Sequence, residues 1–349
     1  MSRPTRETAA GRAYLDLQNH ARRERRGTQE VLTLYVIERW FARLSRSAYA
    51  GDFVLKGGML LAAFGQRRPT ADADALARNM GHDEAAVAAR VAEVGGLPDP
   101  DDGVEFLTDT VASRTIREEA HYSGVRVTMD ARIATAMVKL RLDINFGDPI
   151  TPPPQVVELP ALRTGVAPVR VLGYPIETVL AEKIATAIEL GPANTRVRDY
   201  ADVQTLTGSS DVGYASARDA LMTTALFRGV ELRPLSDVVG NLVLLRSRAY
   251  TAYRSSLGQY GEHLPEEFAE VVAATISFAD PLITDQPKRW VARERRWTAD
   301  DMATNASIMY VVTEAPGARR VRGGRGAPAR LVQGPAAPSS GPRSTDRGP

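Results

Sequence analysis

The sequence lacks cysteine altogether and has only four histidines in 349 residues. Without cysteine, neither a disulfide nor a thiolate metal site can form, and the shortage of histidine disfavours a zinc enzyme. No apolar run is long enough to cross a bilayer, and the N-terminus has no signal-peptide hydrophobic segment. We therefore expect a cytoplasmic protein that makes no membrane contact.

The composition is that of a globular protein, with 44% hydrophobic and 25% charged residues. At this length the chain can form a large core, and we expect two packed lobes. The net charge of +2 hides an asymmetry, because the segment from Ala315 onwards has seven arginines and one acid. Residues 315–349 are rich in Gly, Pro, Ala and Ser, and we expect a disordered tail. The remainder is mildly acidic, so RNA binding would require a local basic patch.

One stretch of the sequence combines a glycine pair with two closely spaced carboxylates. An apolar run beginning at Phe53 meets Gly57-Gly58, an apolar helix follows, and a strand then carries Asp72 and Asp74. Residues i and i+2 of a strand point to the same face, so the two carboxylates should lie side by side. Adjacent carboxylates repel each other, and divalent cations relieve that repulsion. The glycines leave backbone N–H groups bare at a helix start, where a phosphate would be held. Together these features indicate nucleotidyl transfer.

The glycine pair followed by Asp-x-Asp resembles the signature of the polymerase-β-like nucleotidyltransferase superfamily. Either piece alone is more often a turn or a solvated loop, but further segments narrow the match. Between about Leu17 and about Leu245, four segments look like the AbiEii/AbiGii toxin family: Lys56-Gly57-Gly58, Arg68-Pro69-Thr70-Ala71-Asp72-Ala73-Asp74, Ala181-Glu182-Lys183 and Arg198-Asp199-Tyr200-Ala201-Asp202.

This resemblance implies an α/β (α+β) fold, with a mixed sheet in a polymerase-β-like core and a mostly helical C-terminal lobe. Members of that family are toxins of bacterial type IV toxin–antitoxin systems, linked to abortive infection. The resemblance further implies a metal-dependent nucleotidyltransferase that uses two Mg²⁺ ions and an NTP. Family members suggest the tRNA 3′ end as acceptor, arrest of translation and growth as the outcome, and a cognate antitoxin encoded alongside.

A third acid is expected on residues 138–144, where apolar side chains alternate with polar ones and the last polar one is Asp143. In the superfamily that the chain resembles, a carboxylate near the end of such a strand completes the metal site. The resemblance therefore makes Asp143 a catalytic residue and metal ligand together with Asp72 and Asp74. Alternatively, Asp143 only terminates the strand with the polar residues that follow it.

The remaining predicted site residues lie on two consecutive expected helices. Lys183 falls within residues 176–190, and Asp199 and Asp202 begin the next helix. By resemblance this block is the second half of the active site. There Lys183 would join Lys56, Gly57 and Gly58 at the nucleotide phosphates, since a mobile ammonium suits that task. One of the two aspartates would be the functional acid and the other a cap. Alternatively, Lys183 is a surface residue whose stem covers apolar neighbours.

A run of three prolines, residues 152–154, cannot lie in a central strand or a helix interior, and we place a lobe boundary there. Residues 1–150 would then hold the N-terminal helices and the nucleotidyltransferase core. Residues 151–314 would form a helical lobe that completes the active site. A β meander is expected over residues 104–144. Helices are expected over 29–46, 83–94, 176–190, 199–207, 217–226, 235–245 and 266–279.

Two other functions are compatible with the sequence. The first is a non-catalytic NTP-binding module, and the second is nucleotidyl transfer to a small molecule or a protein. The joint presence of Asp72, Asp74 and Lys183 argues against the first, because binding alone would tolerate the loss of one acid. The helical lobe is compatible with a macromolecular acceptor without identifying one.

Overall fold

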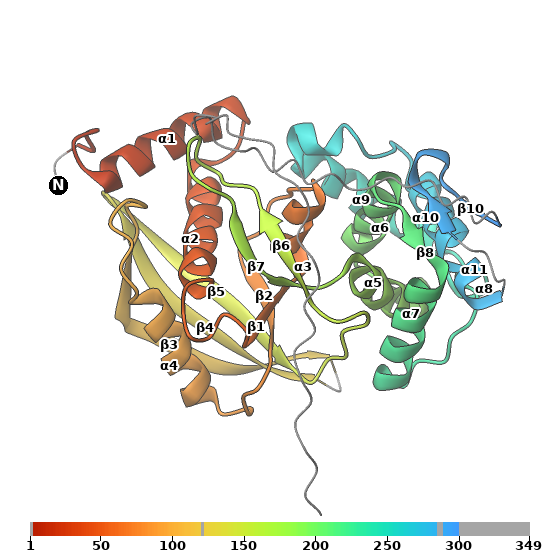
Figure 1. Cartoon of the computed structure of the whole chain (residues 1–349). Helices are drawn as coiled ribbons and strands as arrows, with labels where there is room; N and C mark the ends of the chain where they lie inside the picture. The colour runs from red at the N-terminus through yellow and green to blue at the C-terminus, as the bar shows by residue number, and fades with distance from the viewer. Residues whose placement is uncertain (1–2, 120–121, 285–288, 300–349) are drawn as a thin grey trace, which may run out of the picture. The chain divides into compact units, whose positions relative to one another are not determined.

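The computed structural model describes residues 3–119, 122–284 and 289–299 of the chain. A seven-stranded sheet is built in the order β3-β4-β5-β2-β1-β7-β6 (Figure 1). Its strands are β1 (Phe53–Lys56), β2 (Ala73–Ala77), β3 (Glu105–Glu119), β4 (Tyr122–Ile133), β5 (Ala136–Phe146), β6 (Gln155–Leu159) and β7 (Val169–Gly173). Strand β2 runs parallel to β5, and β1 parallel to β7, while the other neighbours are antiparallel. The predicted α/β class with a mixed sheet is confirmed.

Helices α1 (Ala9–Arg23), α2 (Thr28–Leu44) and α4 (Glu84–Gly95) cover one face of this sheet (Figure 1). The apolar side chains of α2 recur at helical spacing, so one side of the helix is buried along its length. Trp40 of α2 meets Phe53 of β1 edge-on, with ring centroids 5.8 Å apart. Because side chains alternate along a strand, Lys56 then lies on the opposite face of the sheet from α2.

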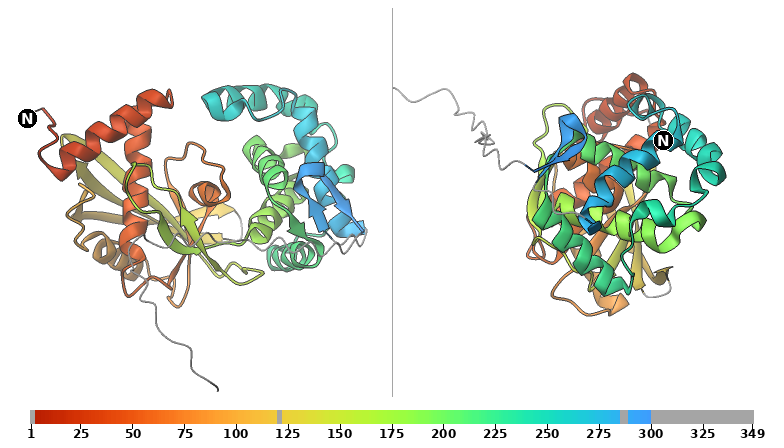
Figure 2. Two further views of the ribbon diagram at one scale, coloured as in Figure 1. Left: turned by 45° about the horizontal axis from the view of Figure 1, so that its top comes forward. Right: turned by 90° about the vertical axis from the view of Figure 1, so that its right-hand side faces the viewer.

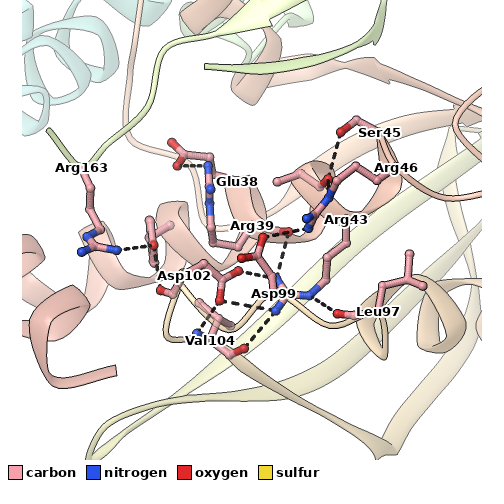
Figure 3. A network of polar contacts seen from close by, with 12 residues as sticks. Glu38, Arg39, Arg43, Ser45, Arg46, Leu97, Asp99, Asp102, Val104 and Arg163 are labelled. Carbon is pink, nitrogen blue, oxygen red and sulfur yellow. Dashed lines mark hydrogen bonds and ion pairs between the residues drawn. The ribbon is translucent and has the colours of Figure 1, made fainter. Parts of the chain in front are cut away.

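A buried ion pair and several hydrogen bonds hold α2 to the loops around it (Figure 3). Arg43, with 3% of its surface exposed, pairs with the carboxylate of Asp102 and donates to the carbonyls of Leu97 and Val104. Glu38 accepts a hydrogen bond from the backbone N–H of Leu162 at 2.9 Å. These contacts fix the loops that lead into β3 and β7, on the side of the sheet away from Lys56.

The sheet continues past the proline run at residues 152–154, since β6 and β7 follow it and β7 pairs with β1. The boundary expected at residue 150 therefore falls inside the sheet region, which extends to Gly173. In chain order β7 is the last strand of that sheet, and the first helix of the following part begins soon after it, at Ile176. The predicted tail, residues 315–349, lies outside the described residues.

The second half of the described chain is mostly helical, and its helices pack against one another (Figure 2). They are α5 (Ile176–Leu190), α6 (Val197–Ser209), α7 (Tyr214–Arg228), α8 (Leu235–Val238), α9 (Leu242–Ser256), α10 (Phe268–Ala279) and α11 (Pro281–Thr284). The single helix expected over 235–245 is in fact two, because Gly240 has φ of +47° and ends the first one. Within the described ranges, no helix has the length and apolar character needed to span a membrane.

A small three-stranded sheet, ordered β10-β9-β8, packs against the helices. Its strands are β8 (Val212–Gly213), β9 (Arg289–Val291) and β10 (Arg296–Thr298). Trp290 of β9 is buried and packs edge-on against Phe278 of α10, with ring centroids 5.0 Å apart. Aromatic packing therefore holds the last described strands onto the helices.

Candidate active site

A row of charged side chains crosses the face of the large sheet opposite α2. Strand register places Lys56 opposite Asp74, Asp74 opposite Asp143, and Asp143 opposite Arg126. Residues in register on neighbouring strands share a face and lie roughly 5 Å apart. The sheet itself thus brings two predicted carboxylates, Asp74 and Asp143, next to each other between two cations.

Asp72 lies just before β2 begins, two residues ahead of Asp74. The hydroxyl of Thr70 donates to the Asp72 backbone carbonyl at 2.9 Å and contacts its Oδ1 at 3.2 Å. The sequence predicted both acids on one strand, but in the structure Asp72 lies in the bend that leads into β2. Both side chains line the same cleft.

Gly57 is required by its own conformation and by its neighbour. It follows β1 directly, begins the short helix α3 (Gly57–Leu60) and has φ of +66°. A Cβ atom at this position would lie only 1.8 Å from Oδ2 of Asp74. The missing side chain is therefore what lets the Asp74 carboxylate lie against the glycine turn. Phosphate binding at Gly57 and Gly58, which both line the cleft, stays a prediction.

Asp143 is almost fully enclosed, and Arg126 engages both of its oxygens. The Arg126 Nε donates to Oδ1 at 2.6 Å, and its Nη2 pairs with Oδ2. The Asp143 side chain is 4% exposed, against 25% for that of Arg126. Such a two-pronged contact is the strongest form of ion pair between side chains. The predicted third acid is therefore in the right row, but it already has a cation.

Lys56 belongs to a second cluster, which links β1 to α5. Its Nζ lies 2.8 Å from Oδ2 of Asp148 and 3.0 Å from Oε1 of Glu182, and 5.2 Å from the centre of the Tyr174 ring. Burial alone would lower the pKa of Lys56, but Glu182, Tyr174 and Asp148 outweigh it and raise the pKa well above its ordinary value. Lys56 is therefore a charged residue that joins the sheet to α5, with Arg228 close to the same glutamate.

Lys183, the next residue along α5, is held between two acids of α6. Its Nζ lies 2.8 Å from Oδ1 of Asp199 and 2.8 Å from Oδ2 of Asp202. Asp202 also pairs with Arg68, whose Nε lies 3.2 Å from its Oδ1. Burial alone would lower the pKa of Lys183, but Asp199 and Asp202 raise it on balance. Lys183 is therefore no surface lysine, because its ammonium neutralises two largely buried carboxylates.

These side chains surround a cleft of about 310 Å³, the lower end of the usual range for ligand sites. Eight of the nine predicted site residues line it, and Asp202 lies behind Lys183 instead. The lining side chains carry seven positive and six negative charges. Seven of them had no role in the sequence-based prediction: Arg68, Arg126, Asp148, Glu182, Arg196, Arg198 and Arg228. Three of these, Arg68, Glu182 and Arg198, lie in the family segments; the other four had no signal in the sequence.

The carboxylates fit a divalent cation only in part. Asp72 and Asp74 offer the oxygen donors that Mg²⁺ prefers. The oxygens of Asp143, however, are engaged by Arg126. In the part of the chain that the structure describes, no group of three or more His, Asp or Glu side chains is arranged to hold an ion. A metal site at these carboxylates stays a prediction, and Asp143 would have to leave Arg126 to take part in it.

The structure is of the α/β class, and its mixed sheet carries a glycine turn beside a row of carboxylates. The family described as nucleotidyl transferase AbiEii toxin, type IV TA system, matches residues 39–274. The chain therefore belongs to the AbiEii nucleotidyltransferase toxin family, and membership implies an antitoxin partner.

Two solved structures are similar at a low level. A candidate nucleotidyltransferase from H. pylori is 14% identical with a TM-score of 0.42, and the match covers 73% of this chain and 96% of that one. JHP933 from Helicobacter pylori is 15% identical with a TM-score of 0.37, over 66% and 97% of the two chains. No curated protein shows significant sequence similarity.

Proposed function

We propose that this toxin transfers a nucleoside monophosphate from an NTP to the 3′ end of tRNA, and that this arrests translation and growth. The observation that carries the proposal is the make-up of the cleft. Asp74 and Asp143 come to it from the sheet, and Asp72 from the bend before β2. Lys183 and Asp199 come to it from the helices. Carboxylates beside cations are what transfer of a phosphoryl-type group requires.

Asp72 and Asp74 would hold Mg²⁺, of which two ions are expected, with Asp143 as a further ligand. Bound there, the metal supplies charge neutralisation and alignment for an in-line displacement. The protein's own residues account for the remaining roles. Lys183 and the cleft arginines give the triphosphate its positive surroundings.

In the proposed reaction, the acceptor hydroxyl oxygen forms a bond to the α-phosphorus of the NTP. The bond from that phosphorus to the β-phosphate oxygen breaks, and pyrophosphate leaves with the electron pair. The hydroxyl proton passes to the carboxylate of Asp143, which lies in the row beside Asp74. Positioning and charge neutralisation provide the rate, and no covalent intermediate is needed. Asp199 is the proposed functional acid of α6, because it lines the cleft and Asp202 does not.

A polynucleotide end suits this cleft. The chain outside residues 315–349 carries a net negative charge. RNA binding therefore requires a local cluster of cationic side chains. Seven cationic side chains, five of them arginines, line the cleft together with its six acids. Arginine forks match phosphate geometry, which favours a phosphate-bearing acceptor over a neutral small molecule.

The test is incubation with each labelled NTP in turn and total RNA, followed by separation of RNA, protein and small molecules. We expect label on tRNA-sized RNA, and loss of at least about 100-fold in Asp72→Asn, which should fold as well as the wild type because one of two adjacent like charges is removed. Asp101→Asn, an exposed acid outside the cleft, is the matched control and should transfer normally.

Label on protein or on a small molecule would instead support the alternative acceptors. Binding of NTP without transfer to any fraction would support a non-catalytic module. An Asp72→Asn protein that still transfers nucleotide would contradict the proposed mechanism, in which Asp72 holds the metal.

A further inference from the structure

The ion pair between Arg126 and Asp143 limits what else the Asp143 carboxylate can bind. Strand register makes the two residues direct neighbours on β4 and β5, so the pair is imposed by the sheet. The guanidinium donates to Oδ1 and contacts Oδ2 as well. Any cation that approaches Asp143 therefore meets both an occupied carboxylate and a positive charge.

Asp143 also needs a cation at all times. Its side chain is 4% exposed, and a buried carboxylate without a positive partner is strongly disfavoured. Asp72 differs, because it lies in the bend before β2 and is only partly buried. Asp143 can thus exchange one cation for another, but it cannot stand alone.

We propose that Arg126 is a positioning residue that keeps Asp143 from binding a divalent cation until a triphosphate enters the cleft. Arg126 then turns to the triphosphate, and Asp143 takes the metal in its place. The inference rests on the proposed function for the identity of the anion. It gives the site an order of events, in which the third carboxylate becomes available only when nucleotide is present.

The geometry supports the exchange on the Arg126 side as well. Its side chain is 25% exposed and lines the cleft. A guanidinium fork fits phosphate oxygens as well as it fits a carboxylate. A triphosphate carries several negative charges against the single charge of Asp143, so it competes effectively for the arginine.

The first experiment measures Mn²⁺ binding to the free full-length protein by titration calorimetry, without nucleotide. Arg126→Gln should bind Mn²⁺ about tenfold more tightly than the wild type, since Asp143 is released. Asp143→Asn should leave the wild-type affinity unchanged, because Asp143 does not contribute there. The double variant Arg126→Gln/Asp143→Asn should lose the gain. Arg114→Gln is the matched control, since Arg114 is in register with Arg126 one strand further from Asp143, and it should change little.

The second experiment measures binding of inorganic tripolyphosphate in EDTA, where no metal takes part. Arg126→Gln should bind it about fivefold more weakly, and Asp143→Asn about fivefold more tightly, because that change frees the guanidinium. The double variant Arg126→Gln/Asp143→Asn should bind it no more tightly than Arg126→Gln does, whereas a general loss of negative charge from the cleft would tighten binding there as well. If Arg126→Gln does not fold, the Asp143→Asn results in the two experiments decide the question by themselves.

Weaker or unchanged Mn²⁺ binding in a folded Arg126→Gln protein overturns the proposal, and so does weaker tripolyphosphate binding in Asp143→Asn. These readouts are separate from the transfer assay. An enzyme that labels tRNA but fails both binding tests keeps the proposed function and loses the inference. A protein that passes both binding tests but transfers no nucleotide keeps the inference about Arg126 and loses the proposed function.

Discussion

Removing the ammonium of Lys183 should destabilise the protein by about 3 kcal/mol, in addition to weakening nucleotide use. In the folded chain this ammonium lies 2.8 Å from Asp199 and 2.8 Å from Asp202, whose side chains are 12% and 5% exposed. Loss of one partner from a buried ion pair costs about 3–5 kcal/mol. Asp202 keeps Arg68 as a partner, whereas Asp199 is left with Arg196 at 4.0 Å. The lower end of that range is therefore expected for Lys183→Ala.

The loss should depend on pH in a defined direction. Burial alone would raise the pKa of Asp199, but Lys183, with Arg198 and Arg196, outweighs it and lowers that pKa below its ordinary value. A carboxylate whose pKa is lowered on folding adds stability above its unfolded-state pKa of about 4. That stability is lost as the pH falls through the folded-state value. The difference between wild type and Lys183→Ala should be full at neutral pH and should shrink below about pH 4.

The measurement is thermal unfolding followed by circular dichroism, at neutral pH and at about pH 3.5. At neutral pH we expect a fall of about 6 °C in the midpoint. The matched control is Lys139→Ala, because Lys139 also forms an ion pair, with Asp130 at 2.6 Å, but its side chain is 54% exposed. That variant should lose at most about 1 kcal/mol. Equal midpoints for Lys183→Ala and the wild type at neutral pH would refute the reasoning, and a difference that persists unchanged in acid would refute the part assigned to Asp199.

Local patterns in the sequence were enough to find one half of the site. The strand ending at Lys56, the glycine turn and the two acids after it are contiguous, and each follows from a short-range rule. The helix predicted over 176–190 is α5, with the same bounds. Alternation along a strand and helical periodicity depend only on near neighbours, which is why these elements could be read directly.

The charge partners could not be read in this way, because they depend on strand register and helix docking. Lys56 meets Glu182 across 126 positions of sequence, and nothing near either residue indicates the other. Arg126 lies in a segment whose alternation predicts a strand, but only the pairing of β4 with β5 sets it against Asp143. The sequence therefore indicates which acids are present, whereas the fold decides which of them already has a cation.

Two further pairs of variants separate the scaffold from the site. Arg43→Ala leaves the buried carboxylate of Asp102 without its partner and should lower the free energy of unfolding in urea by about 3–5 kcal/mol. The side chain of Arg46 is 53% exposed, so Arg46→Ala should lower it by at most about 1 kcal/mol. Both variants should transfer normally per folded molecule, because α2 covers the sheet face opposite the cleft. Gly57→Ala and Gly65→Ala both place a side chain at positive φ, +66° and +76°, and each should cost about 1–2 kcal/mol. Only the first puts a Cβ within 1.8 Å of the Asp74 carboxylate, whereas nothing lies within 4 Å of the second. Gly57→Ala should therefore lose transfer by about 100-fold or more and Gly65→Ala should keep it, and equal activity in the two would show that the position of the Asp74 carboxylate against the glycine turn does not matter for the chemistry.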